Sequence, residues 1–395
     1  MPMISWTEHG AERTARWHSE NGAPPPTRLD IADDTLTADR ALRRLRDGTA
    51  LLWRGDYPGA RQLLTAVGRR IDRRRPPRHR DVAQLFRAHR AQRAERARLL
   101  GGVVVLLEPG HRLDLRRAPD VAEACRAAYG ESEEPRLVSL PELLGVLSAH
   151  QWQLNGVPIP ALDARIHARY GVFSPVRSEY VDLVAEAPMP PVPGGAEAMD
   201  LGTGTGVLAA VLARRGAAHV LATDINPRAV DCAQENIRRL GLEGRVTVLE
   251  ADLFPPGRAD LVVCNPPWLP GAATSALELG IYDDASSMLR GFLDGLPAHL
   301  RPGGEAWLIL SDLAEHLQLR SRQELKRMIE GAGLEVLGRL ETAPRHPRAR
   351  DPRDPLHAAR SQEATVLWRL APTRDRQSRD DGTGGAPGAP TATAA

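Results

Sequence analysis

Several features that define whole classes of proteins are scarce in this chain of 395 residues. It has 3 cysteines, Cys125, Cys232 and Cys264, and their spacing excludes a disulfide framework or a zinc ribbon. No apolar run approaches the roughly 18 residues that a membrane span needs. The N-terminus also has no apolar signal-peptide core. We therefore expect a cytoplasmic protein without membrane segments and without a metal site.

Lysine is almost absent as well, since Lys326 is the sole lysine among 52 basic residues. The 50 acidic residues bring the formal net charge to +2, so overall charge predicts no particular partner. Only residues 69–98 are strongly basic. Their arginines either contact RNA phosphates or belong to a solvated helix and linker. These arginines are Arg69, Arg70, Arg73, Arg74, Arg75, Arg78 and Arg80.

Changes in composition and periodicity divide the chain into four parts. Residues 1–34 are polar and contain prolines, and we expect a flexible arm there. Residues 35–150 show mostly helical periodicity without a chemical motif, which predicts a helical substrate-recognition domain. Residues 151–371 alternate between strand and helix patterns. Residues 372–395 are a tail of Gly, Ala, Pro and Thr that we expect to be disordered.

The alternation within residues 151–371 is typical of an α/β fold with a doubly wound parallel sheet. The segment before the last strand, residues 341–361, shows no helical pattern, so that strand can return antiparallel. We predict a Rossmann-like seven-stranded sheet whose last strand is antiparallel, preceded by the mostly helical N-terminal domain. Open sheets of this kind bind ligands at the carboxyl ends of their strands.

The first strand of this sheet runs into the sequence Asp200-Leu201-Gly202-Thr203-Gly204-Thr205-Gly206. Glycine lets a backbone adopt left-handed dihedrals and approach a ligand closely. A dinucleotide fingerprint would place its third glycine at position 207, which is Val207 here. An acid before the glycines suits a ligand with an ammonium group better than a pyrophosphate. The predicted cofactor-binding residues of this loop are Asp200, Gly202, Thr203, Gly204 and Gly206.

Two further acids end the next two strands. Asp224 follows Gly204 at the spacing of about 20 residues at which an acid reaches a ribose diol. Asp252 ends the third strand, where a carboxylate can accept the exocyclic amine of adenine. Ile225 and Leu253, next to these acids, belong to the same predicted site. A ligand with an amino-acid end, a ribose and an adenine fits all three acids, and that ligand is S-adenosylmethionine.

Asn265-Pro266-Pro267-Trp268 follows the strand predicted for residues 259–264. An amide or aryl-amine nitrogen is a poor nucleophile because its lone pair is delocalised. If the Asn265 side-chain oxygen and the Pro266 carbonyl accept its two N–H groups, the lone pair is aimed at a methyl group. Prolines hold these carbonyls in a fixed geometry, and Trp268 can stack on the flat acceptor. We predict that these four residues form a transfer site that works by positioning, with Asn265 also touching the cofactor.

The strings DLGTGTGVLA, ATDINPRAVDCAQENIRRLGL, EADLF and NPPW occur in this order in the chain. Together they resemble class I S-adenosylmethionine-dependent methyltransferases with a methyltransferase small domain. The resemblance is greatest to the branch of the release-factor glutamine N5-methyltransferases and the RNA guanine-N2 enzymes. It implies that the first loop and the second-strand acid bind the cofactor, and that a planar nitrogen accepts the methyl group.

The acceptor stays open between two macromolecular classes. One is a protein glutamine amide, as in a translation factor, and the other is an exocyclic amine in RNA, such as adenine N6 or guanine N2. The glutamine enzymes carry a Pro-Arg-Pro-Glu-Thr-Glu string before the first strand, which residues 173–180 (FSPVRSEY) match only in part. A non-catalytic cofactor-binding module is the third possibility, although it has no need of both Asn265 and the glycine loop.

Overall fold

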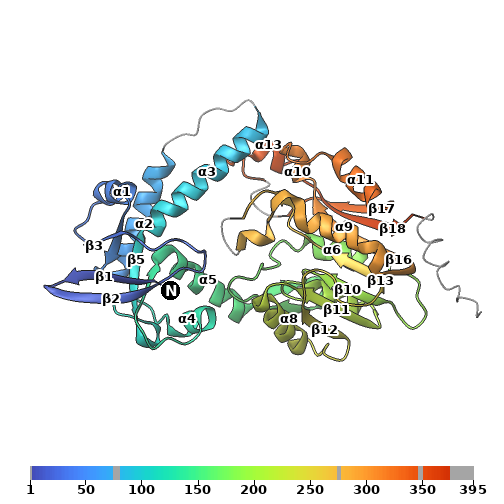
Figure 1. The fold of residues 1–395 in the computed structure, drawn as a ribbon, viewed down its shortest axis with the longest axis horizontal. Coiled ribbons are helices and arrows are strands. Elements are labelled where there is room, and N and C mark those ends of the chain that lie inside the picture. Colours follow the sequence, from blue (N-terminus) through green and yellow to red (C-terminus); the bar gives the residue numbers. More distant parts are fainter. Residues whose placement is uncertain (1, 74–80, 274–276, 346–349, 374–395) are drawn as a thin grey trace, which may run out of the picture.

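The computed structural model describes residues 2–73, 81–273, 277–345 and 350–373, and it contains two separate seven-stranded sheets. Figure 1 shows the N-terminal sheet with its helices on one side of the molecule and the C-terminal sheet on the other. Helix α3 (Val82–Gly101) runs between the two halves. Within the described residues, no helix is long and apolar enough to cross a membrane.

The C-terminal sheet has the predicted Rossmann-like architecture. Its strand order is β12-β11-β10-β13-β16-β18-β17, in which β18 is antiparallel to both neighbours and the other pairs are parallel. The prediction of seven strands with an antiparallel last strand is therefore confirmed. The strands are β10 (Glu197–Leu201), β11 (His219–Asp224), β12 (Val246–Glu250), β13 (Ala259–Cys264), β16 (Leu300–Ser311), β17 (Leu334–Thr342) and β18 (Thr365–Pro372).

Helices cover both faces of this sheet, because successive side chains of a strand point to opposite faces. In β13, Leu261 and Val263 pack into one apolar cluster, whereas Val262 and Cys264 pack into the cluster on the other face. The first cluster includes residues of α6 (Glu179–Glu186), α7 (Val207–Arg214) and α8 (Pro227–Arg239). The second includes residues of α9 (Ser287–His299) and α11 (Arg322–Gly331).

The N-terminal half is built around a mixed sheet of order β1-β2-β7-β5-β4-β3, with β6 paired to β5. Its strands are β1 (Met3–Glu8), β2 (Ala11–His18), β3 (Arg28–Ala32), β4 (Thr49–Trp53), β5 (Val103–Glu108), β6 (Arg112–Leu113) and β7 (Arg136–Ser139). Besides α3, its helices are α1 (Ala38–Arg46), α2 (Tyr57–Asp72), α4 (Ala122–Tyr129) and α5 (Leu140–Asn155).

The flexible arm predicted for residues 1–34 is wrong, because three strands lie there. β1 and β2 form an antiparallel hairpin in which Trp6 pairs with Arg13. Trp6, Ala15 and Trp17 are buried on the core face, while polar residues alternate with them on the other. Half-exposed strands mix apolar and polar residues, and that mixture hid the hairpin in the sequence.

The N-terminal domain predicted for residues 35–150 is mostly helical, but the prediction missed that its helices pack on a mixed sheet. The apolar run Ala50-Leu51-Leu52, which lies in that region, forms the buried centre of β4. This strand is parallel to both β3 and β5. A short continuous apolar run does not distinguish a buried strand from a buried helix, so the sequence pattern could not settle the choice.

Short elements complete the chain between and after the main ones. They are η1 (Pro109–His111), β8 (Val157–Ile159), η2 (Pro160–Leu162), β9 (Ala164–Ile166), β14 (Leu269–Pro270), η3 (Leu277–Gly280), β15 (Tyr282–Asp283), η4 (Asp284–Ser286), α10 (Leu313–His316) and α13 (His357–Arg360). Helix α13 lies in residues 341–361, where no helix was expected. Residues 374–395 of the predicted tail lie outside the described residues, as do Arg74, Arg75, Arg78 and Arg80.

Candidate active site

The turn from β10 into α7 carries three glycines with left-handed backbone, since φ is 70° at Gly202, 56° at Gly204 and 79° at Gly206. A Cβ at Gly206 would lie 3.2 Å from Ala233, and one at Gly202 would lie 2.8 Å from the Met288 side chain. At Gly204 a Cβ would meet nothing within 4 Å. Gly204 lines a cavity, so its backbone faces space that a ligand could fill.

Asp200 lies beneath this loop and is 1% exposed. Its carboxylate accepts hydrogen bonds from the Thr203 hydroxyl (2.6 Å) and from the Ala209 backbone N–H (3.0 Å). Burial raises the pKa of Asp200 to about 6, against the opposing effect of these hydrogen bonds. Among the described residues, Asp200 and Gly206 are not part of the cavity wall. Asp200 therefore supports the glycine loop from behind. The sequence had led us to expect that its carboxylate faces the cofactor.

Asp224 connects the glycine loop to the next strand end. Its carboxylate accepts the backbone N–H of Gly204 and that of Asn226, both at 2.9 Å. Asn226 in turn caps α8 by accepting the Arg228 backbone N–H at 3.1 Å, and Pro227 follows it at the first helical position. Asp224 lines the cavity, and burial raises the pKa of its carboxyl group.

The ends of β11 and β12 complete this side of the cavity. Ile225, 66% exposed, and the exposed Asp252 both line it, as does Leu253. Leu253 has a left-handed backbone, with φ of 61°. Its carbonyl accepts the Thr223 hydroxyl at 2.6 Å, which fixes the strained turn.

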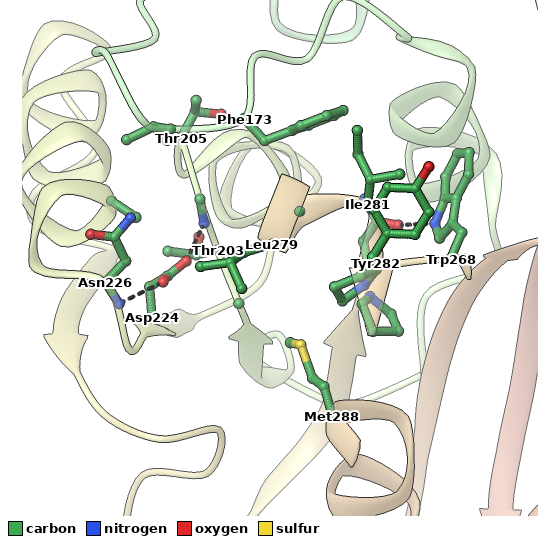
Figure 2. Close-up of a pocket in the computed structure, with 18 of the residues that line it drawn as sticks. Phe173, Thr203, Thr205, Asp224, Asn226, Trp268, Leu279, Ile281, Tyr282 and Met288 are labelled. Carbon is green, nitrogen blue, oxygen red and sulfur yellow. Dashed lines mark hydrogen bonds between the residues drawn. The ribbon is translucent and has the colours of Figure 1, made fainter. Parts of the chain in front are cut away.

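The Asn265-Pro266-Pro267-Trp268 loop follows β13 and lines the same cavity. The Trp268 indole N–H donates to the Asn265 side-chain oxygen at 2.8 Å (Figure 2). This bond sets the orientation of the Asn265 amide. Because an amide oxygen has two lone pairs, it can still accept one further hydrogen bond from a ligand.

Arg177 supports Trp268 from the side. Its guanidinium carbon lies 4.8 Å from the centre of the indole ring, a cation–π distance. The guanidinium is held by ion pairs with the buried carboxylates of Glu179 (3.1 Å) and Glu363 (2.8 Å). Glu363 also accepts the Ser311 hydroxyl at 2.8 Å. Trp268 is thus packed on a charged network that joins α6 to β16 and β18.

The cavity has a volume of about 1090 Å³ and is walled by every predicted site residue apart from Asp200 and Gly206. Figure 2 shows Asp224 and Asn226 on one side and Trp268, Ile281 and Tyr282 on the other. Pockets for one small molecule measure roughly 300–1,000 Å³. The cavity can therefore hold a cofactor and an acceptor group side by side.

Sequence reasoning missed most of the residues on the side of the cavity where Trp268 and Tyr282 lie. Leu279, Tyr282 and Arg93 line the cavity but belong to no motif that we recognised, and Phe173 lies in the string of residues 173–180 but was given no role in the site. A Cβ on Gly280 would lie 3.2 Å from the Phe173 side chain, so the segment before β15 packs closely on Phe173. These residues come from three distant parts of the chain, and no local pattern connects them.

The expectation that the chain has no metal site was made from cysteine spacing. In the ranges that the structure describes, no group of three or more His, Cys, Asp or Glu side chains is placed to hold a metal ion. The three cysteines are buried and unpaired.

Comparison with known proteins identifies a matching family model and several relatives. Residues 163–331 match the family model described as Methyltransferase small domain. The chain is 43% identical over 119 residues, or 27% of its length, to a release factor glutamine methyltransferase of Moorella thermoacetica, covering 42% of that protein. It is 35% identical over 226 residues, or 53% of its length, to the protein of the same name from Rhodospirillum rubrum, covering 65% of it.

A third relative is the ribosomal RNA small subunit methyltransferase C of Alcanivorax borkumensis, at 33% identity over 31% of this chain and 38% of the relative. The chain thus spans less than two thirds of the length of these relatives. The matched part includes the glycine loop, Asp224, Asp252 and Asn265. These matches support a class I S-adenosylmethionine-dependent methyltransferase domain in this part of the chain.

Proposed function

We propose that the protein transfers a methyl group from S-adenosylmethionine to a planar nitrogen. The observation that carries this proposal is that Asn265 and Pro266 wall the same cavity as Gly204 and Asp224. A cofactor site and a group that can hold an N–H donor therefore open into one space. A protein that only bound the cofactor would have no need of this second group.

In the proposed cofactor site, Gly204 gives the ligand access to the backbone, because a side chain there would enter the cavity. Asp224 accepts hydrogen bonds from a ribose diol, and Asp252 accepts the adenine amine. Asp200 holds the loop in place through Thr203. S-adenosylmethionine, when bound, supplies an activated methyl group on a positively charged sulfur.

In the proposed transfer site, the free lone pair of the Asn265 oxygen and the Pro266 carbonyl accept the two N–H groups of the acceptor. Trp268 keeps the Asn265 amide in this orientation through the 2.8 Å bond. Such positioning, with hydrogen-bond acceptors fixed before the reaction, can supply much of the rate enhancement without a general base.

The acceptor classes are a protein glutamine amide and an exocyclic amine of a nucleobase. The names of the relatives include both a release factor and a ribosomal RNA as targets. Each class presents an NH₂ group on a planar carbon, which fits the same pair of acceptors. A cytoplasmic location is compatible with either substrate.

Two measurements test the proposal. Isothermal titration with S-adenosylhomocysteine should detect a complex, and its absence would refute the cofactor assignment. Cell lysate is then incubated with the protein and methyl-tritiated S-adenosylmethionine, and the labelled product is treated with protease or ribonuclease. Label in a macromolecule supports transfer, and the enzyme that releases it identifies the acceptor class. Cofactor binding without any protein-dependent label would contradict methyl transfer.

A further inference from the structure

Helix α3 joins the N-terminal half to the active-site cavity. Near its C-terminal end, Leu99 and Leu100 belong to the apolar core of the N-terminal half. Near its other end, Phe86 packs in a cluster with Leu313 of α10 and Leu356 beside α13. Figure 1 shows the helix crossing from one half to the other. Because α3 is packed at both ends, its middle has a fixed position relative to the cavity.

Arg90 in the middle of α3 contacts the side of the cavity that carries Trp268 and Tyr282. We call this side the acceptor side. Its guanidinium carbon lies 3.7 Å from the centre of the Tyr282 ring. It also donates to the Ala272 carbonyl at 2.7 Å and forms an ion pair with Glu278 at 3.4 Å. These contacts fix the chain that follows the Asn265 loop, so α3 forms part of the transfer site and does not merely lie next to it.

Arg87 and Arg93 lie one helical turn before and after Arg90, so they flank its contact with the loop. Both are exposed, and within the described residues neither forms an ion pair. Arg93 lines the cavity. In contrast, Arg96 pairs with Asp72 and Arg98 pairs with Glu95 further along the helix. Two uncompensated positive charges therefore stand beside the acceptor side.

The acceptor side of the cavity carries three aromatic side chains. Phe173, Trp268 and Tyr282 all line it and are seen together with Ile281 in Figure 2. Aromatic faces of this kind stack on unpaired nucleobases, with about 1–3 kcal/mol per base in proteins that bind single strands. A glutamine side chain is narrow and ends in a small amide group, so it would leave most of this surface uncovered.

We propose that α3 is an RNA-binding element, in which Arg87 and Arg93 contact phosphates of single-stranded RNA while the adjacent base enters the cavity beside Trp268. This inference rests on the proposed methyl transfer and narrows its acceptor to a nucleobase amine. Positive charge next to an aromatic pocket fits RNA better than a protein loop, since phosphates supply the charge and bases supply the flat surface. Within the basic stretch of residues 69–98, the arginines proposed to bind RNA are then those of α3, whereas Arg70 of α2 is paired with Asp39.

The test measures binding of a fluorescein-labelled single-stranded RNA to the full-length protein at several salt concentrations. The variant Arg87→Glu/Arg93→Glu is compared with Arg40→Glu/Arg327→Glu, which makes the same charge change at exposed arginines of α1 and α11. We expect the α3 variant to lose at least about tenfold in affinity, and its slope of log K against log salt to fall by about 1.4, or about 0.7 per phosphate contact. The control variant should keep the affinity and slope of the unmodified protein.

Polyglutamate of similar length serves as a polyanion without bases, and titration with S-adenosylhomocysteine reports on the cofactor site. Equal losses in the α3 and control variants, or no RNA binding at all, would overturn the inference. Binding of polyglutamate as strong as RNA, with the same loss in the α3 variant, would overturn it in favour of an acidic protein partner. If S-adenosylhomocysteine still binds in either case, only the RNA inference fails. If it does not bind the unmodified protein, the proposed function fails independently of the RNA result.

Discussion

The two sides of the active-site cavity are built in different ways. The cofactor side comes from three strand ends within residues 202–253, and its key contacts join neighbouring loops, as Asp224 does with Gly204. The acceptor side is assembled from the Asn265 loop, Phe173, Tyr282 and Arg93, which are far apart in the chain. It is held by long-range contacts such as Arg177 to Glu363 and Arg90 to Ala272.

This difference places the two sides of the cavity under the control of different parts of the fold. All cavity-lining residues of the cofactor side come from the C-terminal half of the chain. The acceptor side takes part of its wall from α3 and therefore depends on how the two halves pack. Changes on one side should leave the other side working, and each of the following predictions tests that separation.

The largest effect is expected at the transfer site. Asn265→Ala should lower the methyl-transfer rate by roughly 10²–10³, the range seen when one preorganised hydrogen-bonding group is removed from an active site. Affinity for S-adenosylhomocysteine should change far less. Tritium incorporation and isothermal titration measure the two quantities. Asn155→Ala, at the exposed end of α5, is the matched control and should change neither. Full labelling by the Asn265 variant would remove Asn265 from the mechanism.

The next effect is expected on the cofactor side. Asp224→Ala should weaken S-adenosylhomocysteine binding by about 10- to 100-fold, because a hydrogen bond to a charged group contributes roughly 1.5–3 kcal/mol. Asp231→Ala is the control, since Asp231 is exposed on α8 and does not line the cavity. Titration calorimetry compares the two variants. Equal affinities for the cofactor product would place the ribose elsewhere.

Substitution of two glycines can distinguish the effect of backbone strain from the loss of a contact with the cofactor. Gly204 and Gly216 both have positive φ, at 56° and 96°, and a Cβ at either would meet nothing within 4 Å. Alanine should therefore lower the free energy of unfolding by roughly 1–2 kcal/mol at each position. Only Gly204→Ala should also weaken S-adenosylhomocysteine binding, because only Gly204 faces the cavity. Thermal denaturation measures the stability of both variants, and titration measures their affinity for S-adenosylhomocysteine. Normal binding by both variants would contradict the contact between Gly204 and the cofactor.

The smallest effect on binding is expected at Asp200, which acts behind the loop. Burial raises its folded-state pKa to about 6, above the ordinary 3.8, so its ionisation destabilises the fold as pH rises between these values. Asp200→Asn removes this ionisation. Its stability relative to the unmodified protein should rise by about 2–3 kcal/mol from pH 4 to pH 7. Denaturant unfolding of the variant and of the unmodified protein at both pH values measures this difference in stability.

The C-terminal fold could be predicted because its signals are local. Strands such as β13 are short apolar runs followed by polar residues, and helices such as α8 bury residues at a 3.6-residue period. The same reasoning failed at β1 and β2, whose alternating exposed residues resemble a polar arm. It also failed at β4, because a buried strand and a buried helix share the same apolar run.

The sequence by itself determined the Rossmann-like sheet, the glycine loop, Asp224, Asp252 and the Asn265 loop, since each is a pattern of neighbouring residues at a strand end. Only the tertiary structure decided that Asp200 lies behind the loop and that Arg90 and Arg93 of α3 reach the acceptor side. These features depend on which distant surfaces pack together. Packing of that kind is set by the shapes and charges of whole faces, and it leaves no periodic trace in the chain.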